Sequence, residues 1–135
     1  MTKVFLRLVA GWILVGSAGA IVMLARPTVW TSTPLPARKF LYPLFAFLLL
    51  VAFPASVGAI RLWKLQMDGL LISAVALCSY ALAEVALLSL DAFVVSRPVD
   101  PRVFGRLALD ALALRWLLSS AAREACASAK RRENP

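Results

Sequence analysis

The sequence predicts an all-α protein, a polytopic bundle of four transmembrane helices. Three observations predict it: 61% of the 135 residues are hydrophobic, only 16% are charged, and the mean hydropathy is +0.82. Ordinary soluble domains are about 45–50% apolar and about 25% charged. This composition excludes a water-soluble globule and a disordered chain, and two cysteines are too few for a disulfide scaffold.

The charge balance is basic, with 15 Lys and Arg against 7 Asp and Glu. Most basic residues flank the apolar runs, where such residues anchor spans and contact anionic lipid headgroups, so we expect no nucleic-acid partner. The chain has no His, which removes the commonest metal ligand and general base. Because phosphate-binding loops, dinucleotide fingerprints and serine elbows are also missing from the sequence, we expect no cofactor, no metal site and no enzymatic activity.

The first two spans are expected at residues 8–25 and 40–60, which are uncharged and long enough to cross a bilayer. Residues 26–39 between them contain three prolines. That proline spacing forbids a continuous helix and predicts a loop. Pro54 lies well inside the second span, and we expect it to kink the helix.

The third span is expected at residues 70–96. On a helix its polar side chains fall along one stripe, which consists of Ser73, Tyr80, Glu84 and Asp91. The opposite side of the helix is almost wholly apolar. Ionisable residues inside a span are functional candidates by default, so Glu84 could relay protons or hold a cationic substrate. The alternative for Glu84 is a structural salt bridge.

The fourth apolar segment, residues 103–122, is interrupted by Arg106, Asp110 and Arg115. Each central charge costs about 2.5–3.5 kcal/mol on insertion scales, so this segment needs a partner helix or an interfacial position. The alternative is three spans with a C-terminal interfacial helix, which the count of basic residues on each side favours. We favour four spans, because Arg106 and Arg115 project from opposite sides of the helix and leave no clean amphipathic face.

A salt bridge between the last two spans is expected from their depth in the bundle. If these helices are antiparallel about a loop centred near residue 99, Glu84 lies level with Arg115 and Asp91 lies level with Arg106. A buried charge persists only when it is paired or hydrogen-bonded, so we expect a Glu84–Arg115 ion pair. Arg106 would instead pair with Asp110, four residues on, or reach outward.

The chain is expected to form one membrane domain over residues 1–135, in a bacterial-type inner membrane with both termini in the cytoplasm. The basic tail, residues 123–135, is expected to be mobile. By elimination we expect a non-catalytic accessory, assembly or interaction subunit that contacts lipids and other transmembrane helices, in a larger membrane complex or a homo-oligomer. The alternative is a small homo-oligomeric transporter or proton-coupled carrier that uses Glu84, and a remoter one is a lipid-modifying enzyme that uses Asp91 or Asp110.

Overall fold

The computed structural model describes residues 1–96 and 98–133, and within these residues the chain is helical with short connections and no strand. The predicted all-α class is therefore confirmed. Arg97, which we expected in the loop before the last helix, and the final two residues of the predicted tail lie outside the described part of the chain.

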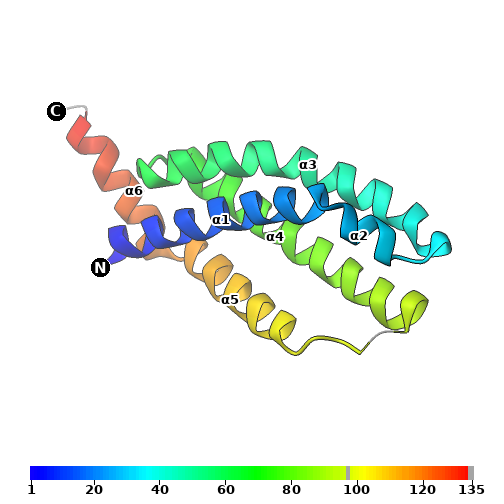
Figure 1. Ribbon diagram of the computed structural model, residues 1–135. Coiled ribbons are helices and arrows are strands. Elements are labelled where there is room, and N and C mark those ends of the chain that lie inside the picture. Colours follow the sequence, from blue (N-terminus) through cyan, green and yellow to red (C-terminus); the bar gives the residue numbers. More distant parts are fainter. Residues whose placement is uncertain (97, 134–135) are drawn as a thin grey trace.

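Three helices are long and apolar enough to cross a membrane. They are α1 (Thr2–Ala25), α3 (Leu35–Trp63) and α4 (Met67–Leu90), the last of which continues through one π-helical segment, η1 (Asp91–Val95). Figure 1 shows them side by side, with α1 and α4 running opposite to α3. The predicted fourth span is not confirmed, because the apolar segment that follows α4 does not form one long helix.

Small residues allow α3 and α4 to approach closely at the end of the bundle where the chain connects the two helices. A methyl group added at Gly58 would clash with the side chain of Ile72, and one added at Gly69 would clash with the backbone of Leu62. Close approach of this kind is typical of helix pairs within membranes. The core that these helices enclose is built mainly of leucine and alanine, including Leu6, Ala10, Ile13, Ala55, Ala59, Leu62, Leu77 and Leu117.

The loop predicted for residues 26–39 is wrong in part. The structure places a short helix there, α2 (Pro27–Ser32), and α3 begins at Leu35. The prolines are compatible with these helices because Pro27 and Pro36 occupy first-turn positions, where the missing N–H has no helical partner to lose. The expected kink at Pro54 stays a prediction, since α3 is helical on both sides of that residue.

The segment predicted as a fourth span, residues 103–122, is divided between two helices, α5 (Arg102–Leu117) and α6 (Ser120–Glu133). Ser119 lies at the break, where its hydroxyl donates to the carbonyl of Trp116 at 2.6 Å and accepts from the amide of Ala122 at 3.3 Å. The Ser119 hydroxyl thus caps one amide of the first turn of α6, that of Ala122. The 16 residues of α5 extend about 24 Å, less than the ~30 Å of a hydrocarbon core.

The basic tail is also different from the expectation of a mobile end. Most of it forms α6, which packs on α1 and α4 through the buried side chains of Ala122 and Cys126. Alanine and cysteine at this four-residue spacing lie on one face of the helix, so α6 has an apolar stripe despite its basic composition. The start of α1 and α6 therefore lie at the same end of the bundle, as Figure 1 shows.

Candidate functional site

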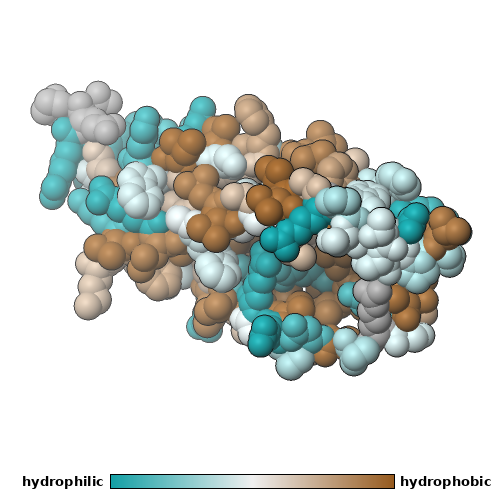
Figure 2. Space-filling view, viewed as in Figure 1, coloured by the Kyte–Doolittle hydropathy of each residue, from teal (hydrophilic) through white to brown (hydrophobic). Residues whose placement is uncertain are grey.

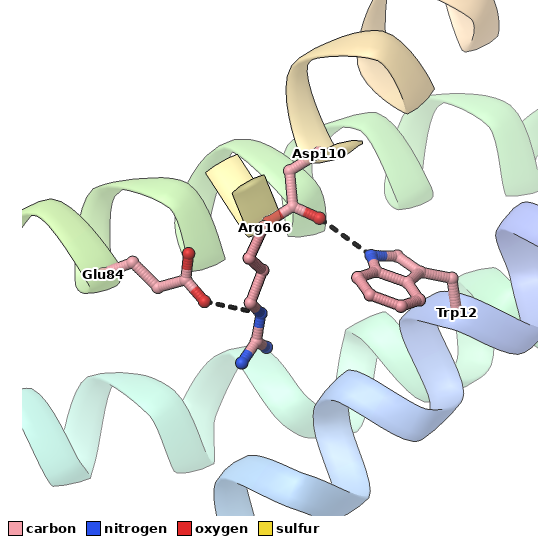
Figure 3. A network of polar contacts seen from close by, with 4 residues as sticks. All are labelled: Trp12, Glu84, Arg106 and Asp110. Carbon is pink, nitrogen blue, oxygen red and sulfur yellow. Dashed lines mark hydrogen bonds and ion pairs between the residues drawn. The ribbon is translucent and has the colours of Figure 1, made fainter. Parts of the chain in front are cut away.

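Charged side chains meet in the middle of the bundle, where α5 contacts α1 and α4. The Nε of Arg106 on α5 lies 2.6 Å from Oε1 of Glu84 on α4. One turn along α5, Asp110 accepts a hydrogen bond of 2.8 Å from the indole nitrogen of Trp12 on α1. Figure 3 shows the four side chains converging from three helices.

The two carboxylates of this cluster are largely removed from solvent. The side chain of Glu84 is 14% exposed and Asp110 is 4% exposed, whereas the side chain of Arg106 is 46% exposed. Arg106 and Asp110 are four residues apart, so they lie on the same face of α5. A carboxylate in an apolar bundle keeps its charge only with a cation or hydrogen-bond donor beside it, and each acid has one here.

The expected pairing of Glu84 with Arg115 is not the one observed, since Glu84 pairs with Arg106. Arg115 is exposed near the opposite end of α5 and takes part in no ion pair among the described residues. Asp91, expected level with Arg106, lies in η1 and is likewise without an ion pair in the described part.

The change of partner follows from the connection between α4 and α5. Ser96 adopts a left-handed backbone conformation, with φ of 55°, and ends η1. Residues 98–101 run back in the direction of the middle of the bundle before α5 begins, as Figure 1 shows. A non-helical chain advances up to about 3.3 Å per residue, against 1.5 Å in a helix. The start of α5 therefore lies deeper in the bundle than a tight hairpin would place it, and Arg106 reaches the level of Glu84.

A second polar contact lies nearby and joins α4 to α1. The hydroxyls of Tyr80 and Ser17 are 2.6 Å apart, and Ser17 donates its proton to the carbonyl of Ile13 at 2.8 Å. Tyr80 is thus the donor to Ser17. Ser73, the next polar residue of the stripe, is fully buried, and its hydroxyl has no hydrogen-bond partner among the described residues.

The structure therefore turns three of the four stripe residues, Ser73, Tyr80 and Glu84, into the bundle. It also brings in two residues, Trp12 and Ser17, that the sequence did not identify as site residues. Trp12 carries a weak signal in hindsight, because it lies inside an apolar run and near the middle of α1, whereas tryptophan usually lies at the ends of spans. Ser17 carries none, since a single serine in a span normally bonds to its own helix.

A cavity of about 390 Å³ adjoins this cluster. Its walls come from α1 to α5, and its polar lining consists of Trp12, Tyr80, Glu84 and Arg106. Small residues of α1 and α4, namely Gly16, Gly19, Ala20 and Ala83, form another part of the wall. The second oxygen of Glu84, Oε2, is buried and has no partner among the described residues. The site thus combines an apolar space with one unsatisfied carboxylate oxygen.

The described residues contain no group of three or more His, Cys, Asp or Glu that could hold a metal ion. Comparison with known proteins finds no matching family model, no matching curated protein and no matching solved structure. Three apolar helices and a charge cluster enclosed by them are compatible with a small α-helical integral membrane protein. Any narrower function follows from the chemistry of the site.

Proposed function

We propose that this chain is an integral protein of a bacterial-type inner membrane and acts as a non-catalytic accessory subunit of a larger membrane assembly. In this proposal α5 is a short fourth span and both termini lie in the cytoplasm. The basic residues that flank the spans support this orientation, because those of α6, the start of α1 and the end of α3 gather at one end of the bundle.

The observation that carries the accessory role is the cavity beside α5. α5 begins only at Arg102, and the non-helical connection before it lies at the edge of the bundle. The half of the bundle that contains the end of α1 and the start of α3 therefore lacks a packed fourth helix. The cavity occupies this half and is walled by Gly16, Gly19 and Ala83. Glycine and alanine allow close helix approach, which is the main requirement for association in lipid. A transmembrane helix of another subunit fits such a wall.

The ion pair between Glu84 and Arg106 agrees with this role. An acid neutralised inside its own chain needs no substrate to remain buried, and it holds α5 against α4. This pair therefore acts as a structural contact that fixes the shape of the partner surface.

Site-specific photocrosslinking in native membranes tests the accessory role. A photoreactive amino acid at Gly19, which lines the cavity and where nothing lies within 4 Å of an added Cβ, is expected to give one discrete adduct with a different protein. The same amino acid at Phe53, 78% exposed on α3, is the matched control and is expected to give lipid adducts alone. Equal adducts at both positions, or none at Gly19, would contradict the proposal.

A second candidate function is supported by the buried Oε2 of Glu84 at the cavity wall. In this case the chain is a homo-oligomeric carrier in which Glu84 binds a proton or a cationic substrate. Purified protein in liposomes would then dissipate a pH gradient, and Glu84→Gln would abolish the flux without changing the oligomer. Asp91→Asn, a change outside the cavity, is the control. No proton flux by the unaltered protein would exclude a proton-coupled carrier.

A further inference from the structure

We propose that the chain binds an anionic phospholipid in a groove at its basic end, between the start of α4 and the break that separates α5 from α6. The groove has a volume of about 340 Å³ and is lined by Met67, Leu70, Leu71, Leu117, Leu118 and Arg123. It is separate from the cavity beside Glu84 and shares no lining residue with it. The inference needs only that the bundle lies in a bilayer.

The groove exists because the last apolar segment breaks at Ser119. Beyond this residue α6 leans on α1 and the start of α4 through Ala122 and Cys126, so the surface between Leu118 and the start of α4 is left without cover. Leu71 and Leu118 are 70% and 54% exposed. An acyl chain covers leucine side chains of this kind, and the volume lies within the range of about 300–1,000 Å³ usual for bound small molecules.

The charge at the rim selects the headgroup. Arg123 is the charged residue of the lining, and its guanidinium has no ion pair or side-chain hydrogen bond within the described part of the chain. Arginine presents several donors in a planar fork that fits the oxygens of a phosphate. An apolar groove with a free guanidinium at its rim thus matches a lipid that carries a phosphate above an acyl chain.

The surroundings favour an anionic lipid over a zwitterionic one. The same end of the bundle carries eight Lys and Arg residues, Lys3, Arg7, Arg61, Lys64, Arg123, Lys130, Arg131 and Arg132. Two acidic residues adjoin the lining in the chain: Asp68, which follows Met67 and lies 3.7 Å from Arg61, and Glu124, which follows Arg123. The eight basic residues of this end outnumber them. Figure 2 shows hydrophilic side chains gathered over α6 and the N-terminal end of α1, next to the hydrophobic flank of the bundle. Basic clusters at this level attract anionic headgroups.

The depth of the groove in the membrane also fits a bound phospholipid. Met67 follows the turn after Trp63 and Lys64, and a tryptophan followed by a lysine is typical of the boundary between hydrocarbon and headgroups. From Met67 the groove extends towards Leu70 and Leu71, into the apolar part of α4. The phosphate would therefore lie at headgroup level while the acyl chain points inward.

Native mass spectrometry of the full chain in mild detergent, titrated with phosphatidylglycerol or phosphatidylcholine, tests the proposal. We expect one phosphatidylglycerol to bind at least about tenfold more tightly than phosphatidylcholine. Arg123→Gln should weaken phosphatidylglycerol binding about tenfold. Arg131→Gln, which removes the same charge from the same helix outside the groove, should weaken it no more than about fivefold, the factor for one diffuse charge. Equal effects of the two changes would overturn the site and leave only the general charge of the basic end.

A second pair of variants tests whether the acyl chain occupies the groove. Leu71→Trp fills it and is expected to reduce phosphatidylglycerol binding at least about fivefold. Leu82→Trp is the matched control, because Leu82 is 67% exposed on the same helix and does not line the groove. Both leucines are exposed, so neither change disturbs the core. Unchanged binding by Leu71→Trp, or equal binding of the two lipids, would overturn the proposal.

Discussion

The Nε of Arg106 and Oε1 of Glu84 lie 2.6 Å apart and join α5 to α4. The guanidinium of Arg106 also lies beside Gly16, since a Cβ at this glycine would be 3.8 Å from Nη2. Asp110 then bonds to Trp12, so α5 is attached through polar groups to both α4 and α1. Polar contacts of this kind explain how a helix that carries Arg106 and Asp110 can belong to an apolar bundle.

Glu84→Gln is expected to lower the free energy of unfolding by about 1 kcal/mol, since polar contacts between membrane helices average somewhat less than this. The loss arises because Arg106 is left without its counter-charge, so adding Arg106→Gln should restore most of the stability. Unfolding in mixed micelles measures both effects. Arg115→Gln is the matched control and should be neutral. A larger loss with Arg115→Gln than with Arg106→Gln would contradict the observed pairing.

Alanine substitutions at three glycines are expected to destabilise the bundle in a fixed order. Gly69→Ala should cost the most, because its Cβ meets only backbone atoms, those of Arg61 and Leu62, and Gly58→Ala should cost less, because the two atoms closest to its Cβ belong to the side chain of Ile72. Gly11→Ala should be neutral or stabilising by up to about 1 kcal/mol, since nothing lies within 4 Å and alanine favours helix. Thermal unfolding of the three variants gives the order. A cost at Gly11 equal to that at Gly69 would contradict the packing of α3 on α4.

Paired topology reporters are expected to place Asp100 outside and the C-terminal end in the cytoplasm. One reporter is active only in the cytoplasm and the other only outside, and each is fused either after Asp100 or at the end of the chain. This result follows if α5 crosses the membrane with Arg106 paired to Glu84 and Asp110 hydrogen-bonded to Trp12. Cytoplasmic signals at both positions would instead make α5 an interfacial helix, as the three-span alternative requires.

Cys126 is expected to react slowly with thiol reagents and faster as the pH rises. Burial raises the pKa of its thiol above the ordinary value, so less of the reactive thiolate is present at neutral pH. The folded state also holds this proton more tightly than the unfolded chain, so its contribution to stability is lost as the pH rises through the raised pKa. Maleimide labelling over pH 7–10 in a Cys78→Ser background measures the reaction. Ser128→Cys in a background of both Cys78→Ser and Cys126→Ser is the exposed control, and equal rates would contradict the packing of α6.

The apolar helices were predictable because their signal is local. Each of the runs at residues 8–25, 40–60 and 70–96 is apolar over enough residues to cross a bilayer, and each lies within a long helix of the structure, apart from the π-helical end of the third. The polar stripe was predictable for the same reason, since helical periodicity alone places Ser73, Tyr80 and Glu84 on one face. These features need no knowledge of neighbouring helices.

The partner of Glu84 was not predictable by matching residues at equal depth in two antiparallel helices, because that method assumes a tight turn at residue 99. The left-handed Ser96 and the connection that runs back in the direction of the middle of the bundle shift the register, so that Arg106 replaces Arg115. The break at Ser119 was missed because the apolar composition continues across it to Ala122. A serine that caps a new helix differs from one inside a helix only by its contacts.

Composition and helical periodicity were enough to predict that this chain is helical and apolar, and that Glu84 lies inside its third long helix. The packing of the helices was needed to show which base pairs with Glu84, that Trp12 reaches Asp110, and where α5 ends. The physical reason is that hydrophobicity and helical period are properties of consecutive residues, whereas the register between helices depends on how each connection turns the chain in space.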